Sequence, residues 1–270
     1  MAFQAPRTPR TCGHVSAIAG RYDQDSTGAT NPSAEGVETL QAFIDTFGRS
    51  IRTAFAIAAA TSSALAAETT VGGTFIQLPP PAGFCDLSDT DPSDKSMLTV
   101  TSDLVSNSGN KLLSMSADCR QLTDWRAQKR PLDDYAQYQT PVALIEKPST
   151  ESVEKTCAGL RAQGDKLVAE KAPNIKSRME SVLEKVKMNE MRFIGVLAED
   201  STACYGGLIH KFQTEAGTDK TQLTVFAATN IKNKSIFVYR MTVYTTSETV
   251  DRTLASLKTN IAALLAANPN

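Results

Sequence analysis

The sequence has almost no net charge and no long apolar run. Its 270 residues include 28 basic and 29 acidic side chains, so the formal net charge is -1. A chain so balanced has no long-range field to hold a polyanion, and nucleic-acid binding by bulk electrostatics is therefore disfavoured. No stretch reaches the roughly 18 consecutive apolar residues of a membrane-spanning helix, so we expect no transmembrane span. The remaining composition, 41% hydrophobic and 21% charged, is typical of a globular protein.

The most informative stretch runs from Arg49 to Glu68 and has the three parts of a secretion signal. Arg49 and Arg52 precede a run of uncharged residues rich in Ala, Ile and Phe, which ends in an A-x-A site, Ala64-Leu65-Ala66, followed by Ala67. The translocon holds the apolar part as a helix, and signal peptidase accepts only small side chains beside the cut. We therefore predict a signal peptide at 49–67 and a periplasmic or secreted protein. The alternative is a buried, alanine-rich helix of the folded domain.

Residues 1–48 precede this signal, which is an unusual position for one. They are poor in bulky apolar groups and rich in Gly, Pro, Ser, Thr and Ala. Such a segment cannot bury enough surface to offset its chain entropy, so we expect it to be disordered. One hypothesis is that translation starts later, for instance at Val37, and that Met1 is a mis-called start.

Four cysteines follow the predicted cleavage point: Cys85, Cys119, Cys157 and Cys204. An even count in an exported chain indicates two disulfides, each contributing about 2–4 kcal/mol. Of the three possible pairings, we favour Cys85 with Cys119 and Cys157 with Cys204, because each joins neighbouring segments. Unpaired buried cysteines are the alternative. The spacing contains no C-x-x-C pair, so we expect neither a metal site nor a cofactor.

Residues 68–270 are predicted to form a single α+β domain, a mainly antiparallel sheet covered by helices. Alternating patterns predict the following strands: 74–78, 83–87, 111–117, 135–142, 191–198, 203–212, 222–228 and 235–244. The turn between the last two falls at 230–234. Residues 120–134 are expected to be irregular.

Three helical segments complete the predicted fold. Asp91 is a good N-cap for the first, and Gly109 provides its stop. The second covers about 149–188, where Gly164 and Pro173 are expected to break it into at least two pieces. The third is an amphipathic C-terminal helix that starts from a capping box at 245–248.

This order of elements resembles the layout of PsbP-like exported α/β/α proteins. The resemblance rests on the strand at 75–79, the following helix and strand, the hairpin at 223–244 and the closing helix at 250–265. The closing strand 236–239, followed by Asn260–Leu264, also resembles uncharacterised exported bacterial proteins. The resemblance implies a non-catalytic accessory or binding role, and it transfers no functional residue. The long helical segment at 149–188 departs from that layout.

The sequence marks no catalytic residue. It contains no G-x-S-x-G elbow, no P-loop, no G-x-G-x-x-G and no H-E-x-x-H. After the signal there is one histidine, His210, and no nucleophile is marked as its partner. A packed or surface histidine is therefore favoured over a catalytic one.

Carboxylates offer no ready site either. The loop from Asp89 begins like an EF-hand, but Asp94 stands where that loop needs Gly, and Val100 stands where it needs Glu. Helix capping by Asp91 and Asp94 is the preferred interpretation.

The compact basic and aromatic segment around Trp125 is the best candidate for binding. Arg126 and Arg130 offer bidentate contacts to an anion, and the indole of Trp125 offers a stacking face. The candidate ligand-binding residues are therefore Trp125, Arg126, Arg130 and His210. The alternative is a tryptophan that covers a sheet edge beside solvated basic neighbours.

These observations favour an exported, non-catalytic binding or accessory protein whose partner is a small molecule or an envelope protein. One alternative is an enzyme with an unrecognised carboxylate site or a His210-centred site. The other is an envelope assembly or stress factor that acts through protein contacts.

Export predicts a defined mature terminus. Sequencing the N-terminus of the native protein should give a start near Ala67 or Glu68, because the A-x-A site at 64–66 suits signal peptidase. A native protein that retains Met1 would contradict the predicted signal.

Overall fold

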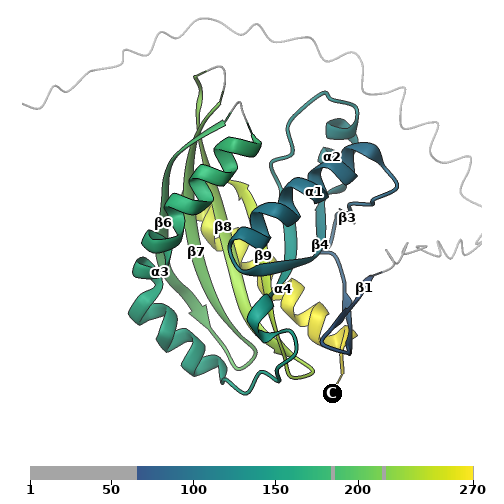
Figure 1. Cartoon of the computed structure of the whole chain (residues 1–270), viewed down its shortest axis with the longest axis vertical. Helices are drawn as coiled ribbons and strands as arrows, with labels where there is room; N and C mark the ends of the chain where they lie inside the picture. Colours follow the sequence, from purple (N-terminus) through teal and green to yellow (C-terminus); the bar gives the residue numbers. More distant parts are fainter. Residues whose placement is uncertain (1–65, 184–185, 215–216, 270) are drawn as a thin grey trace, which may run out of the picture. The chain divides into compact units, whose positions relative to one another are not determined.

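The computed structural model describes residues 66–183, 186–214 and 217–269. These residues belong to a compact unit of residues 61–270. A seven-stranded, fully antiparallel sheet with the order β3-β4-β5-β9-β8-β7-β6 forms its centre (Figure 1). The strands are β3 (Phe84–Asp86), β4 (Asn110–Asp118), β5 (Tyr135–Pro141), β6 (Val186–Glu199), β7 (Ala203–Thr214), β8 (Asp219–Ile231) and β9 (Lys234–Val243).

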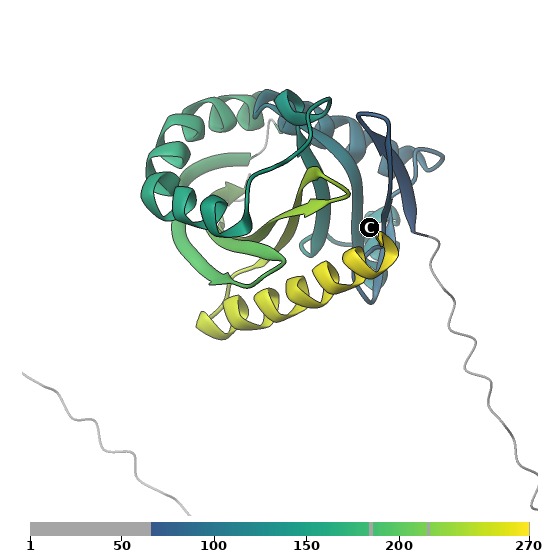
Figure 2. The same cartoon turned by 90° about the horizontal axis from the view of Figure 1, so that it is seen from below.

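Helices cover both faces of the sheet (Figure 2). On one face, α4 (Ser247–Ala267) packs against β8 and β9, next to a separate hairpin of β1 (Ala67–Val71) and β2 (Thr74–Leu78). On the other face, α1 (Pro92–Asn107) and α2 (Cys119–Arg126) lie over β4, and α3 (Val153–Val182) lies over β6 and β7. A short 3-10 helix, η2 (Val142–Leu144), follows β5. The predicted α+β class and the amphipathic C-terminal helix are confirmed.

The α4 face carries the larger hydrophobic core. Leu257, Ile261 and Leu264 of α4 are at most 1% exposed and pack on aliphatic side chains of the sheet and the hairpin. Asn268 then fastens the end of α4 to β2. Its side-chain amide accepts a hydrogen bond from the Gln77 N–H (2.9 Å) and donates one to the Gln77 carbonyl (2.7 Å).

Local signals predicted from the sequence set the bounds of α1. The Asp91 carboxylate accepts hydrogen bonds from the backbone N–H groups of Ser93 and Asp94, as an N-cap does. Gly109 adopts a φ of +83°, which is the left-handed conformation that ends a helix. Between β8 and β9, Lys232 and Asn233 both have positive φ and make the predicted tight hairpin turn.

Two predictions about helices are wrong. The segment 120–134 begins with α2, whose N-terminus is capped by the Asp118 carboxylate through the N–H groups of Arg120 and Gln121. The other error concerns α3, which runs unbroken through Gly164 and Pro173. It curves along the sheet (Figure 2), and Gly164 lies where the Phe193 ring of β6 comes close. Gly164 thus serves helix–sheet packing rather than helix termination.

Both favoured disulfides are present. Cys85 of β3 is bonded to Cys119 at the start of α2, with the Cα atoms 5.0 Å apart. Cys157 of α3 is bonded to Cys204 of β7, with the Cα atoms 5.4 Å apart. Such bonds fit an oxidising compartment. The predicted extension at 1–48 lies outside the described residues, as does the signal peptide except for Ala66 and Ala67.

No helix within the described ranges is long and apolar enough to cross a membrane.

The two glycines of α3 should respond in opposite ways to substitution by alanine. In Gly164→Ala the new Cβ would lie 2.3 Å from Phe193 Cε1, so we expect a loss of about 1–3 kcal/mol in the free energy of unfolding. Gly159 has open space around it, and Gly159→Ala should gain about 0.5–1 kcal/mol from helix propensity. Urea unfolding of both variants measures the difference. Equal effects of the two substitutions would contradict this packing.

Candidate functional site

The sheet face beneath α1 and α3 is covered unevenly. α1 packs on β4, α3 packs on β6 and β7, and the two helices also contact each other. Neither helix packs closely on β5 or β9 within the described residues. The central strands β5 and β9 therefore have no helix packed closely on this face. We call the space between the central strands and the two helices the groove.

The strand register identifies the side chains that face the groove. Side chains alternate across a sheet, and Cys204 marks the groove face because it is bonded to Cys157 of α3. The residues opposite one another on this face form two rows, Gln137–Tyr239–Phe226–Gly206 and Gln139–Phe237–Ala228–Cys204.

Three aromatic rings form a platform in the middle of this face. The Tyr239 ring centroid lies 5.9 Å from that of Phe226 and 6.3 Å from that of Phe237. Gly206 gives Phe226 its room, because a Cβ at Gly206 would lie 2.4 Å from Phe226 Cζ. None of the three rings belongs to either hydrophobic cluster of the described residues. The platform therefore lines the groove and does not fill a core.

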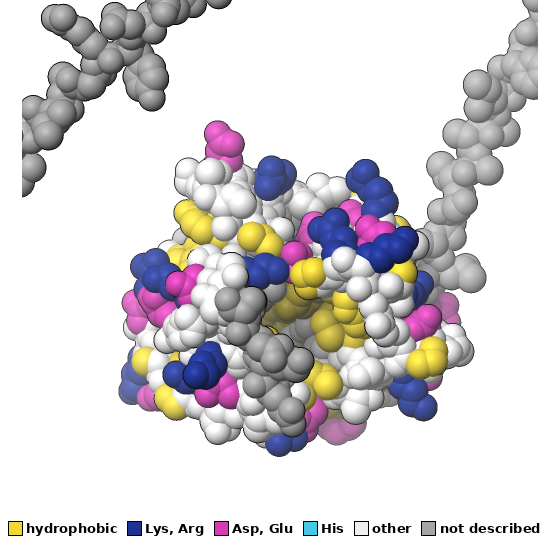
Figure 3. Space-filling model, turned by 90° about the horizontal axis from the view of Figure 1, so that it is seen from above, with side chains coloured by type: hydrophobic (Ala, Val, Ile, Leu, Met, Phe, Trp, Pro, Cys, Tyr) yellow, Lys and Arg dark blue, Asp and Glu magenta, His cyan; other side chains and the backbone are white. Residues whose placement is uncertain are grey.

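A cavity lies beside the β8–β9 turn, at one end of this face. This cavity has a volume of about 250 Å³, and Ala228, Phe237, Leu144 and the first residues of α3 are among those that line it. Seen from the other end of the sheet, the surface is also hollowed, and hydrophobic side chains line the hollow (Figure 3). Small-molecule sites in proteins are concave and mostly apolar in this way.

Amide and hydroxyl groups lie beside the rings. Asn110 Nδ2 donates to Gln139 Oε1 (3.1 Å), and Gln139 Nε2 donates to Gln137 Oε1 (2.8 Å). Further along the same face, Gln222 Nε2 donates to the Tyr135 hydroxyl (3.2 Å). Buried amides of this kind give orientation to a ligand that is otherwise held by apolar contact.

Two titratable groups in the middle of this face, Tyr239 and His210, are neutral at physiological pH. Burial raises the pKa of Tyr239 above its usual value, so its hydroxyl keeps its proton. Burial also lowers the pKa of His210 to about 4, so its imidazole is uncharged. Lys220, at the end of the groove near Phe212, is paired with the carboxylate of Asp133.

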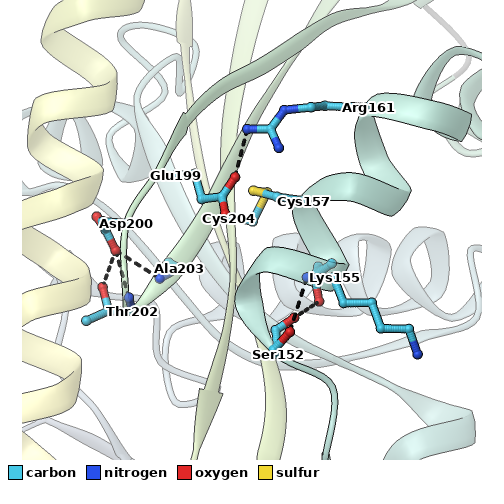
Figure 4. Close-up of a disulfide and its surroundings, with 10 residues drawn as sticks. Ser152, Lys155, Cys157, Arg161, Glu199, Asp200, Thr202, Ala203 and Cys204 are labelled. Atoms are coloured by element: carbon cyan, nitrogen blue, oxygen red, sulfur yellow. Dashed lines mark hydrogen bonds and ion pairs between the residues drawn. A yellow bond between two sulfur atoms is a disulfide. The ribbon is translucent and has the colours of Figure 1, made fainter.

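The helix that bridges the groove is fastened at three points. The Cys157–Cys204 disulfide holds its first turns to β7, and beside it Arg161 Nη2 lies 2.7 Å from Glu199 Oε2 (Figure 4). Towards the other end of α3, Arg178 Nη2 lies 2.6 Å from Asp103 Oδ2 of α1. These contacts fix the position of α3 over the sheet.

Of the residues predicted as a site, His210 is the one that lies on the groove face. Its ring is stacked on Phe212 at 6.0 Å, and its buried Nδ1 has no hydrogen-bond partner among the described residues. No hydrogen bond in the described structure joins it to a carboxylate or a nucleophile. Its place fits a lining residue better than a general base.

The other predicted residues lie around α1 and α2. Trp125 packs with Leu122 and Met115 under the helices, and it lines a shallow depression beside Pro92. Arg126 forms two hydrogen bonds with Asp94, Nε to Oδ1 (2.9 Å) and Nη2 to Oδ2 (2.5 Å). Arg130 is exposed. Trp125 and Arg126 thus have structural partners, and no contact of the described residues brings them to His210.

The carboxylates of the Asp86–Asp94 loop do not converge. Asp91 caps α1 and Asp94 binds Arg126. Burial raises the pKa of Asp86 to about 6, and its Oδ1 has no hydrogen-bond partner among the described residues. The described part of the chain contains no group of three or more His, Cys, Asp or Glu side chains that could hold a metal ion.

Sequence reasoning missed the ring platform and the amide chain. Alternation along 135–142 and 235–244 assigns residues to two faces, but it does not show which face is left open. One available signal was the amide-rich stretch Gln137–Gln139, since buried strands rarely carry two glutamines on one face.

No known protein family, curated protein or solved structure matches this chain. Membership in the PsbP-like family therefore stays a prediction.

Arg126 should matter for stability. Burial acts to raise the pKa of Asp94, but hydrogen bonds from Arg126 and the Ser88 N–H outweigh it, and the pKa lies below its usual value. Because Asp94 is 0% exposed, Arg126→Ala should cost about 1–2 kcal/mol at neutral pH, allowing for the partial exposure of Arg126.

The control for that variant is Arg130→Ala, which changes an exposed arginine and should cost less than about 0.5 kcal/mol. A lowered pKa stabilises the fold above the unfolded-state pKa and loses that effect as pH falls through the folded-state pKa. Urea unfolding should therefore show the Arg126→Ala deficit shrinking below about pH 4. A deficit that is independent of pH would count against the ion pair.

Proposed function

We propose that the protein is an exported, non-catalytic binding protein that holds a small, neutral, mostly apolar molecule in the groove. The observation that carries the proposal is the ring platform of Phe226, Phe237 and Tyr239, which lies on a buried sheet face outside both hydrophobic clusters. Aromatic rings beside a few oriented polar groups are typical of small-molecule sites.

The side chains that line the groove carry no charge, and this favours a neutral ligand. The two rows of strand residues that face the groove contain no charged side chain, and His210 is uncharged at physiological pH. A charged ligand group would lose its hydration there without gaining a counter-charge from these strands, which is costly. A neutral ligand avoids this cost.

The cysteines support the proposed compartment. Two disulfides fit an oxidising environment such as the periplasm or the exterior of the cell. The predicted signal at 49–67 agrees with that environment. The Cys157–Cys204 disulfide also holds α3 to β7 beside the groove, so formation of this bond in an oxidising compartment would help to shape the proposed site.

A neutral fluorophore tests the groove. N-phenyl-1-naphthylamine should bind the purified protein saturably and increase its emission as it leaves water. Ala228 is 5% exposed and lines the cavity, so Ala228→Leu should fill that space and weaken binding about tenfold or more.

The matched control is Ala262→Leu, the same change on the exposed face of α4. Its affinity for the probe should equal that of the wild type. Both variants are first compared by near-UV circular dichroism, so that a loss of binding is not a loss of folding. Failure of the wild type to bind, or equal binding by Ala228→Leu, would overturn the proposal.

A further inference from the structure

The buried amides beside the ring platform form a chain with a direction. Asn110 donates to Gln139, and Gln139 donates in turn to Gln137. Gln137 Oε1 is therefore occupied, and Gln137 Nε2 is the last donor of the chain. It makes no hydrogen bond with the described residues, and it is not among their buried polar atoms that lack a partner, so it remains open to water.

The last donor lies next to the rings. Gln137 and Tyr239 are directly opposite each other in the β5–β9 register, on the groove face. The Tyr239 hydroxyl keeps its proton, because burial raises its pKa. Two neutral donors thus stand beside one aromatic platform.

A donor without a protein partner selects for an acceptor once a ligand displaces the water beside it. A donor that loses water without gaining an acceptor costs free energy, so a ligand that supplies the acceptor is preferred over one of the same shape that does not. Aromatic rings prefer to stack on flat conjugated groups. One ligand meets both requirements when its hydrogen-bond acceptor is conjugated with its flat ring system.

We propose that the ligand is a flat, neutral, conjugated carbonyl compound, such as an aryl ketone or a quinone. Its carbonyl oxygen accepts a hydrogen bond from Gln137 Nε2, and its rings lie on Phe226, Phe237 and Tyr239. This inference rests on the proposed binding function and adds the chemical class of the ligand.

Two matched probes test the carbonyl. The first is 6-propionyl-2-(dimethylamino)naphthalene, and the second is its propyl analogue, which has the same rings and no carbonyl. The oxidised full-length protein should bind the ketone about tenfold more tightly than the propyl analogue, which corresponds to one net hydrogen bond. Ketone emission also shifts when its carbonyl accepts a hydrogen bond.

Variants assign that preference to residues. Gln137→Leu should reduce the ratio of the two affinities to about one, because the last donor is removed. Tyr239→Phe leaves the amide chain intact, and it should retain tight binding of both probes through the ring. Gln163→Leu, the same change at an exposed position of α3, should retain the tenfold ratio.

The outcomes separate the inference from the proposed function. Equal affinity for the two probes in the wild type, or a preference that survives Gln137→Leu, would overturn the carbonyl inference while groove binding stands. Absence of binding by both probes and by N-phenyl-1-naphthylamine would overturn both. Circular dichroism and urea unfolding establish that each variant is folded before its affinity is compared.

Discussion

The packing of α4 on the sheet is the interaction on which the rest of the structure depends. Apolar side chains of α4, of the central strands and of the β1–β2 hairpin fill this side, and Leu257, Ile261 and Leu264 are at most 1% exposed. Each such side chain contributes about 1.5–3 kcal/mol when it is buried. Because this face supplies a large core, the opposite face can carry amides and open aromatic rings without unfolding the sheet. Because the stability comes mainly from the α4 face, the opposite face is free to carry the binding site that we propose.

The bridging helix turns that open face into an enclosed one. A helix held by packing alone would move closer to the aromatic rings, because burying them from water is favourable. Here the disulfide at Cys157 holds one part of α3 to β7, and the Arg178–Asp103 pair ties another part to α1. Gly164 brings α3 close to Phe193 at the sheet edge. Held to β7 and to α1, α3 lies over β6 and β7 and does not pack closely on β9 or β5.

Much of this fold was readable from the sequence, because its signals are local. Asp91 and Gly109 mark the ends of α1, and the alternating patterns place most strands to within a few residues. They missed β1, and they placed the start of β6 at 191, whereas it begins at Val186. The course of α3 was not readable. Whether Gly164 ends a helix or admits a neighbouring ring depends on Phe193, a residue on another element. The candidate site was missed for a similar reason. Gln137, Phe226 and Tyr239 come from three strands, and only the register and the helix positions show that they share an open face.

The bonds between Asn268 and Gln77 have a consequence for the order of folding. They join residues separated by 191 positions, so the contact between β2 and the end of α4 can form only after residues 77–268 have all been synthesised. Until then the β1–β2 hairpin lacks this contact, and the core that α4 forms with the sheet and the hairpin is incomplete. A core that closes only after residue 268 leaves the chain unfolded for longer, which suits the export that we propose.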